Sequence, residues 1–441
     1  MSHSASIRLL SATEWGLVST SVVAIQVVVV LISAGLPLAI TRLWFDADRG
    51  TLRARGMYGF LAGGAALLGI ITAAVVAAAG LWTGGAVAWP AVMAMVSIGL
   101  LGTVLGAQAV LRAQNRPVAF VVLSLVSSVA ANLAGLGAIL FTTATAAVYL
   151  AAYTVAVAVA AVLALTFVRP TVPWRVAGVT RESVAIAVPL LPHTGALMLL
   201  TQGAVLLLAA LTGAVPAGQY GAVLIFALGP LTLLNALNNA WATRLMEAAE
   251  AKLPALLRRV AVEAFVAAAV IGALASAAAT AGAFILTQSP EELSPVARVL
   301  PLVSSGYALF LVATNMVYIL QRTSTMAYLT PMVLVVMAAA ATPFALHGNL
   351  MAVAGVQAGG FILLGVVYQR SVAVFSPGAW PLRLFIGVTI AHLALVLILG
   401  LLPDTFVSGI AEAGVVGIVL VALAALLLRN RRQVEHTPTA S

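Results

Sequence analysis

Long apolar runs, separated by short polar loops, follow one another along the whole of this 441-residue sequence. Most are about 20 residues long or longer, which is the length of helix that crosses the roughly 30 Å hydrocarbon core of a bilayer. Charged residues make up only 7% of the chain, whereas a soluble domain carries about 25%. The runs are continuous and lack the alternation of a membrane β-strand. The sequence therefore predicts an all-α polytopic membrane protein.

The loops between these runs carry the basic residues in alternation. Of the Lys and Arg residues, nineteen fall in alternate loops that begin with 42–55 and end with the C-terminal tail, and only Arg8 and Arg298 fall in the others. Cytoplasmic loops collect Lys and Arg, so the first set and the C-terminus are expected in the cytoplasm. Topology and anionic lipid explain the net charge of +9 better than a nucleic-acid partner does. The predicted spans are 15–41, 56–82, 89–111, 118–141, 145–168, 183–211, 217–243, 260–287, 296–320, 326–346, 349–368, 383–402 and 408–428.

The thirteen predicted spans place residues 1–14 outside the cell, with no helix before them to carry Arg8 across. The simplest interpretation is that one helix is missing ahead of residue 1; the alternative is a genuine outer N-terminus. With that helix restored, the pattern is two six-helix lobes and two further helices. The expected parts are an N-terminal lobe (1–168), a cytoplasmic linker (169–182), a C-terminal lobe (183–368), two extra spans (369–428) and a cytoplasmic tail (429–441).

The two lobes share short motifs about 200 residues apart. Residues 13–16 (Thr-Glu-Trp-Gly) and 218–221 (Gly-Gln-Tyr-Gly) each open an apolar run, and these runs close on Thr-Arg-Leu at 41–43 and 243–245. Both copies have the same orientation, so the repeat is parallel, with its axis along the membrane normal. Two lobes related in this way, with a cavity between them, are typical of alternating-access transporters.

Four stretches carry a resemblance to a known family: residues 9–16, residues 35–37 with 41–46, residues 111–114, and residues 187–193 with 218–221. On these stretches the chain resembles bacterial polysaccharide flippases of the O-antigen type, within the multidrug/oligosaccharidyl-lipid/polysaccharide exporter superfamily. The first helix of that family is absent here. The resemblance implies a multi-pass protein of the bacterial cytoplasmic (inner) membrane that acts in lipopolysaccharide or other cell-envelope polysaccharide biosynthesis. Its substrate would be an oligosaccharide linked through pyrophosphate to a polyprenol, and its partners would include membrane lipids, glycosyltransferases and a polysaccharide polymerase.

Arginines at the ends of equivalent spans are the first candidates for binding this substrate. Arg42 and Arg244 close the two repeated runs, and Arg112 and Arg322 stand in matching positions one hairpin later. A pyrophosphate needs cations where it enters, and Arg pairs with phosphate oxygens through two hydrogen bonds. The alternative is that these residues are topological anchors whose side chains extend to the lipid headgroups.

Uncharged polar residues inside the spans are the second group of candidates. His193 follows two prolines, Pro189 and Pro192, which are expected to break or kink the helix and expose a polar cavity wall. A packed histidine bound to a carbonyl is the alternative. The other candidates are suited either to sugar hydroxyls or to hydrogen bonds between helices. They are Asn235, Asn238 and Asn239, which share one helical face, and Gln202 and Gln26.

Several kinds of chemistry have no counterpart in the sequence. It holds no Walker-type glycine loop, carboxylate pair, metal-ligand cluster or nucleophile–His arrangement, so we expect no enzyme activity, cofactor or metal. No Asp or Glu lies near the middle of a predicted span, and Glu412 lies near an outer end. The favoured function is a flippase. The first alternative is a cation-coupled drug or small-molecule antiporter, which needs a buried carboxylate; the second is a non-transporting scaffold of a polysaccharide assembly complex.

Overall fold

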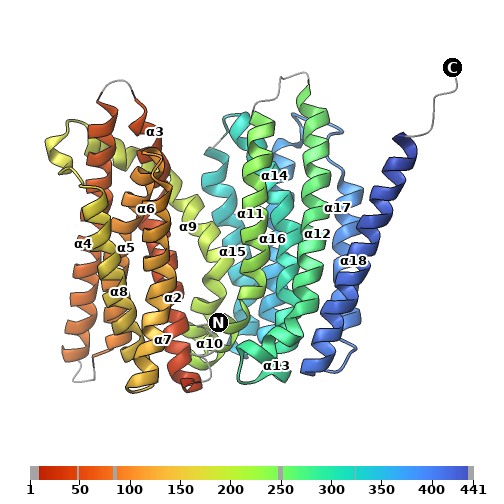
Figure 1. The fold of residues 1–441 in the computed structure, drawn as a ribbon, viewed down its shortest axis with the longest axis horizontal. Helices are drawn as coiled ribbons and strands as arrows, with labels where there is room; N and C mark the ends of the chain where they lie inside the picture. The colour runs from red at the N-terminus through yellow and green to blue at the C-terminus, as the bar shows by residue number, and fades with distance from the viewer. Residues whose placement is uncertain (1–8, 47–48, 83–86, 247–251, 323, 436–441) are drawn as a thin grey trace. The chain divides into compact units, whose positions relative to one another are not determined.

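A computed structural model describes residues 9–46, 49–82, 87–246, 252–322 and 324–435 of the chain, and within them every regular element is a helix (Figure 1). Arg8 and the end of the predicted tail lie outside these residues. The helices are α2 (Ala12–Ser33), α3 (Leu36–Trp44), α4 (Gly50–Trp82), α5 (Trp89–Ala113), α6 (Pro117–Ser124), η1 (Leu125–Ala130), α7 (Ala131–Phe141), α8 (Ala146–Phe167), η2 (Pro173–Arg175), α9 (Val179–Leu211), α10 (Ala214–Val223), α11 (Ile225–Met246), α12 (Leu253–Leu286), α13 (Pro290–Val299), η4 (Leu300–Leu302), α14 (Val303–Ile319), α15 (Ser324–Leu346), α16 (Leu350–Ala373), α17 (Leu382–Leu399) and α18 (Phe406–Glu435).

Eleven helices of the described chain are long and apolar enough to cross a membrane, and a twelfth span is formed if α10 and α11 are taken together. These two helices are bent by 43° where they join. The apolar part of α18, Phe406–Ala422, falls just short of the same length. Together they match the thirteen predicted spans in order, and the predicted class, an all-α polytopic membrane protein, is confirmed.

The span predicted at 15–41 is two helices. Ala34 and Gly35 have φ values of 33° and 79°, so α2 ends there in a left-handed turn and α3 begins afterwards with Pro37 in its first turn. Such φ values are natural for Gly and costly for other residues. A Cβ on Gly35 would lie 2.5 Å from Cδ1 of Leu190, so the glycine also allows α9 to approach.

Helix α9 runs without a break through Pro189 and Pro192. Of the predicted break or kink, the break does not occur. Each proline removes one backbone hydrogen bond, but α9 packs along both α2 and α15. Neighbouring helices commonly hold a proline-containing span together in this way.

The contacts divide the chain into two compact units. Unit 1 comprises Met1–Ala222 and Arg322–Leu350, and unit 2 comprises Val223–Gln321 and Met351–Ser441. Helices α9, α10 and α15 therefore belong to the same compact unit as the helices that precede residue 169. The packing of α9 against α2 and α15 is the reason.

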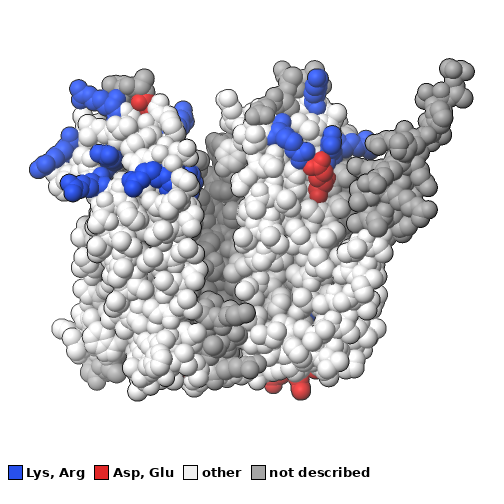
Figure 2. Space-filling view, viewed as in Figure 1, with Lys and Arg blue, Asp and Glu red and all other residues white. Residues whose placement is uncertain are grey.

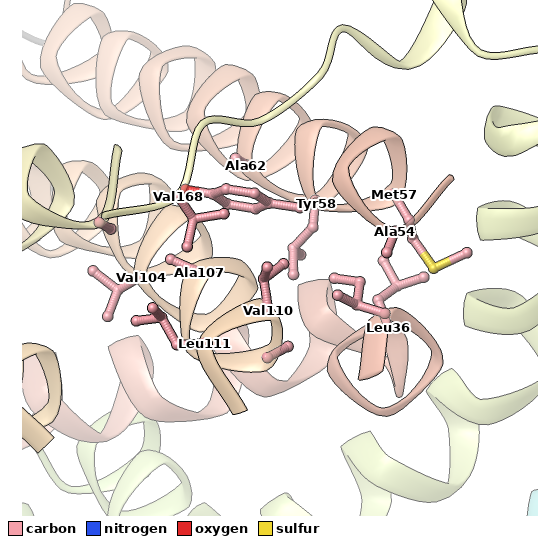
Figure 3. Packing of buried hydrophobic residues seen from close by; sticks show 14 of the residues in the cluster. Leu36, Ala54, Met57, Tyr58, Ala62, Val104, Ala107, Val110, Leu111 and Val168 are labelled. Atoms are coloured by element: carbon pink, nitrogen blue, oxygen red, sulfur yellow. The ribbon is translucent and has the colours of Figure 1, made fainter. Parts of the chain in front are cut away.

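The core of unit 1 holds α3, α4 and α5 together (Figure 3). Tyr58 and Met57 of α4 are fully buried among Leu36 of α3 and Val110 of α5. Small residues let α4 and α5 approach closely, and a Cβ on Gly102 would lie 2.2 Å from the Cβ of Ala65. Close approach of small residues is a principal source of helix association in a membrane. This packing fixes the end of α3 and the start of α4, which carry several arginines.

The two motifs that open the repeated runs touch each other within unit 1. The indole N–H of Trp15 donates a hydrogen bond to the carbonyl of Gly218, at 3.0 Å. A Cβ on Gly218 would lie 2.6 Å from Cα of Gly16, so α2 and α10 cross almost backbone to backbone.

The core of unit 2 surrounds α14, which is buried almost throughout. Rings of α14 and α16 pack edge to face, with the Phe310 and Tyr368 centroids 4.9 Å apart. A Cβ on Gly306 would lie 2.3 Å from the backbone of Phe361, so this pair of helices also depends on a glycine. Helix α12 packs against α17 and α18 on its other sides.

Candidate functional site

Basic side chains gather at one end of each unit (Figure 2). In unit 1 this is the end where α3 meets α4 and where α9 begins, with Arg42, Arg53 and Arg181. In unit 2 it is the end where α11 finishes and α12 begins, with Arg244 and Arg259. The grouping agrees with the alternation of basic loops in the sequence.

Arg42 borders a hollow of about 690 Å³ in unit 1, which we call the Arg42 hollow. The arginine is exposed and lies in the last turn of α3. Apolar side chains from two helices form much of the wall, and two acidic residues and a second arginine complete it. The lining is Gly35, Ala39, Arg42, Leu43, Phe45, Asp46, Arg53, Glu182, Ile186 and Leu190. The hollow therefore joins charged groups to an apolar surface.

An ion-paired cluster around Arg53 closes one side of the Arg42 hollow. The guanidinium of Arg53 donates to Oδ2 of Asp46 at 2.9 Å and to both carboxylate oxygens of Glu182 at 2.9 and 3.0 Å. The ion pair with Asp46 joins the end of α3 to the first turn of α4. The bond to Glu182 spans 129 residues of sequence and was not foreseen. It ties the start of α4 to the start of α9.

Arg244, the counterpart of Arg42 in the repeat, has a different environment. Its guanidinium is paired with the carboxylate of Glu263 in α12, with Nη1 3.4 Å from Oε1. Arg259 shares the same carboxylate at 3.2 Å. Arg244 therefore already has an anionic partner, whereas no ion pair of Arg42 occurs among the described residues. The two arginines occupy equivalent positions in the sequence repeat, but their electrostatic environments differ.

The second pair of predicted arginines lies at helix ends, with Arg112 in the last turn of α5 and Arg322 just before α15. The guanidinium of Arg112 stacks over the ring of Phe120, 5.6 Å from its centroid. Arg322 is exposed just before α15, and its carbonyl accepts a hydrogen bond from the amide of Thr325. Neither residue lines the Arg42 hollow.

The three asparagines of α11 divide between packing and exposure. Asn238 accepts a hydrogen bond from Asn315 of α14 at 2.9 Å, and Asn235 accepts one from the Tyr307 hydroxyl at 2.9 Å. Asn235 and Asn239 nevertheless remain exposed. Hydrogen bonds to α14 therefore engage both Asn235 and Asn238, although Asn235 also remains exposed, as does Asn239.

The other polar candidates, His193, Gln202 and Gln26, also differ in whether they are buried or exposed. His193 is only 7% exposed, and its Nδ1 lies 2.8 Å from the hydroxyl of Thr330 on α15. Gln202 is buried on α9 and donates to the sulfur of Met198 on the same helix. Gln26 is exposed near the middle of α2. The structure therefore places His193 and Gln202 in packed surroundings and leaves Gln26 on the surface of unit 1.

A buried ionic cluster in unit 2 was not recognised in the sequence. Arg298 is 1% exposed, and its guanidinium donates hydrogen bonds to Glu412 at 3.0 Å and to the hydroxyl of Thr280 at 2.8 Å. It also forms an ion pair with Asp404 at 2.9 Å. Glu412 is itself only 3% exposed. The signal was a single Arg within the apolar run of α13 and α14 and a single Glu within that of α18. Among the described residues, no group of three His, Asp or Glu side chains could hold a metal ion.

No protein family model and no curated protein matches this sequence. Several solved structures share its architecture. An inward-facing multidrug resistance MATE family transporter of the MOP superfamily has a TM-score of 0.65 and 12% identity, over 86% of this chain and 92% of that one. The inward closed form of the lipid II flippase MurJ has a TM-score of 0.59 and 11% identity, over 95% and 97%. A MOP superfamily transporter from Pyrococcus furiosus has a TM-score of 0.50 and 14% identity, over 89% and 88%. At these identities the likeness is one of fold, and the chain accordingly has the fold of the MATE and MurJ transporters.

Proposed function

We propose that this protein is an alternating-access transporter that moves a polyprenyl-pyrophosphate-linked oligosaccharide across the bacterial cytoplasmic membrane. The fold that it shares with MATE and MurJ transporters supports transport as the general activity. The chemistry of the site supports the choice of substrate. Glycosyltransferases would supply this substrate on the cytoplasmic side and a polymerase would consume it on the other.

The Arg42 hollow is the observation that carries the proposal. A lipid-linked pyrophosphate presents an anion joined directly to an apolar chain, and the hollow presents Arg42 beside Phe45, Ile186 and Leu190. The guanidinium binds phosphate oxygens through two charge-assisted hydrogen bonds. The apolar wall accepts the first isoprene units.

The charge balance of the Arg42 hollow suits a cargo that must be released. Arg42 and Arg53 are offset by Asp46 and Glu182 in the same wall. A transported ligand has to bind well enough to enter and weakly enough to leave. A hollow whose formal charges cancel meets this requirement better than a strongly cationic one.

Exposed amides on the spans provide a second line of support. Gln26 on α2, and Asn235 and Asn239 on α11, are polar groups on the surface of apolar helices. Polar groups that face lipid are costly, and such residues usually face a water-filled path. Amide groups can both donate to and accept from sugar hydroxyls.

Reconstitution tests this function directly. The full-length protein is placed in liposomes with a fluorescent polyprenyl-pyrophosphate oligosaccharide, and the label that reaches the opposite leaflet is measured with a membrane-impermeant quencher. Replacing Arg42→Gln removes one bidentate phosphate contact, which is expected to slow transfer about tenfold. The matched control is Arg116→Gln, an exposed arginine of unit 1 that does not line the hollow and is expected to transfer at the wild-type rate.

Other outcomes would favour the alternatives. Equal transfer by wild type, R42Q and liposomes without protein would contradict a flippase, and unchanged surface glycan in cells carrying R42Q would then point to a scaffold. A cation-coupled antiporter has one observation in its favour, because the MATE transporter matches with the higher TM-score of 0.65. That function requires uptake of a cationic dye driven by a proton or sodium gradient and abolished by Glu263→Gln.

A further inference from the structure

A second hollow of about 780 Å³ borders the same Arg53–Glu182 ion pair. We call it the arginine hollow, because Arg49, Arg53, Arg175 and Arg181 all contribute to its wall. Glu182 is the one acidic residue in its lining, so the formal charge of the wall is +4 − 1 = +3. This differs from the Arg42 hollow, where the formal charges cancel.

Three of these guanidinium groups have no counter-charge in the described chain. Arg53 is bound by Glu182 and Asp46. The side chains of Arg49, Arg175 and Arg181 make no ion pair or hydrogen bond with any other described residue. Like charges around one hollow repel each other, and an anion bound between them replaces this net repulsion by a net attraction.

The backbone at the arginine hollow also favours an anion. Helix α9 begins at the hollow with Gly178 as its N-cap, at φ 81°, and no side chain caps its first turn. The first amide groups of a helix are free donors and carry the positive end of its dipole. Arg53 lies in the first turn of α4 and Arg181 in that of α9. A cation in the first turn destabilises a helix, so Arg181 does not stabilise the start of α9, whereas Arg53 is held in place by its ion pairs with Asp46 and Glu182.

The position of the arginine hollow at the membrane surface indicates which anion it can bind. The hollow lies at the beginning of two candidate membrane spans, α4 and α9. Next to Arg175, Trp174 is 82% exposed, and exposed tryptophans are typical of the membrane interface. Leu52 and Ala185 provide an apolar part of the wall beside the arginines. Phosphate groups of anionic lipids are concentrated at this level of the membrane.

We propose that the arginine hollow binds the phosphate group of an anionic phospholipid. Arg175 and Arg181 contact the phosphate oxygens, and the free amides at the start of α9 donate to them. Glu182 holds Arg53 at the boundary between the two hollows, which keeps the lipid phosphate apart from the transported substrate. The site is distinct from the Arg42 hollow and does not depend on what the protein transports.

Native mass spectrometry of the full-length protein in detergent tests this site. Wild type is titrated with dioleoylphosphatidylglycerol or with zwitterionic dioleoylphosphatidylcholine, and the first bound lipid is measured. Phosphatidylglycerol is expected to bind about tenfold more tightly, and the variant R175Q/R181Q to lose at least this preference. The control R116Q/R169Q removes the same charge from exposed positions outside the hollow and is expected to change the affinity less than about twofold.

A second variant keeps every charge. Ala185→Trp fills the hollow, and it is expected to weaken phosphatidylglycerol binding as R175Q/R181Q does. Loss of binding in both variants would show that the effect of R175Q/R181Q does not come from misfolding of that variant. Equal losses in R175Q/R181Q and R116Q/R169Q would overturn the proposal in favour of diffuse attraction. Saturable binding of inorganic pyrophosphate that R175Q/R181Q abolishes, with no preference for phosphatidylglycerol, would assign the hollow to a soluble phosphate and overturn the lipid site.

Discussion

The buried pair of Arg298 and Glu412 makes the stability of unit 2 depend on one carboxylate. Replacing Glu412→Leu keeps a similar volume and leaves the Arg298 guanidinium, which is 1% exposed, with Asp404 as its remaining acidic partner. Removal of one partner of a buried ion pair costs about 3–5 kcal/mol. The lower end of this range is expected here, because the partly exposed Asp404 carboxylate remains 2.9 Å from the guanidinium as an ion-pair partner. We therefore expect a loss of about 3 kcal/mol.

The double variant Arg298→Met with Glu412→Leu separates the ion pair from its surroundings. An apolar pair of similar size is often as stable as a buried ion pair. The Thr280 hydroxyl loses its bonds to both residues, which costs about 1–3 kcal/mol if nothing replaces them. The double variant is still expected to be more stable than Glu412→Leu alone, since it no longer buries an unbalanced cation.

Thermal unfolding of the purified protein in detergent, followed by intrinsic tryptophan fluorescence, measures both variants. The control is Glu291→Gln, an exposed acidic residue in the first turn of α13, which is expected to leave Tm nearly unchanged. The reasoning is refuted if Glu412→Leu lowers Tm no more than this control does. It is also refuted if the double variant is less stable than Glu412→Leu by as much as Arg298→Met alone destabilises the wild type.

Three further predictions concern packing and topology. Gly218→Ala puts a Cβ 2.6 Å from Cα of Gly16 and should cost about 1–3 kcal/mol in thermal unfolding, whereas Gly229→Ala, with open space around it, should not destabilise. A double-mutant cycle of His193→Ala and Thr330→Val should give a coupling of about 0.6–1.7 kcal/mol, and zero coupling would show that their 2.8 Å contact contributes nothing. Because the chain has no Cys, a single introduced cysteine reports on which side of the membrane it lies. Thr142→Cys should react with a membrane-impermeant maleimide in intact cells, and Thr180→Cys should react only after lysis. The reverse pattern would contradict the predicted orientation.

The number and order of the spans could be predicted because hydropathy is a local property. The break between α2 and α3 could not be placed in this way, since Ala34, Gly35 and Pro37 are themselves apolar enough to extend the run. Their backbone preferences carried the signal, and a Gly two residues before a Pro is a known end of a helix. The hydropathy of α9 was likewise a better guide than its prolines, because neighbouring helices support it.

The candidate site was predicted only as far as residue type and helix ends allow. Arg42 could be found because it closes a span, and the structure gives it a hollow. The difference between Arg42 and Arg244 depends on Glu263, which belongs to the next helix. The Arg53–Glu182 bond and the Arg298–Glu412 bond join residues more than a hundred positions apart. No periodicity or local spacing in one sequence reports such contacts.

The crossing of α2 and α10 has a consequence for how the protein is made. The Trp15 indole and the Gly218 carbonyl are separated by 203 residues. At about 5–20 residues per second of synthesis, about 10–40 s pass between the emergence of one partner and that of the other. During this interval α2 is already in the membrane, with its own backbone hydrogen bonds made. The side of α2 that carries Gly16 is covered only by lipid until α10 arrives. The last steps of assembly of unit 1 therefore wait for helices that the ribosome delivers late, α10 and then α15.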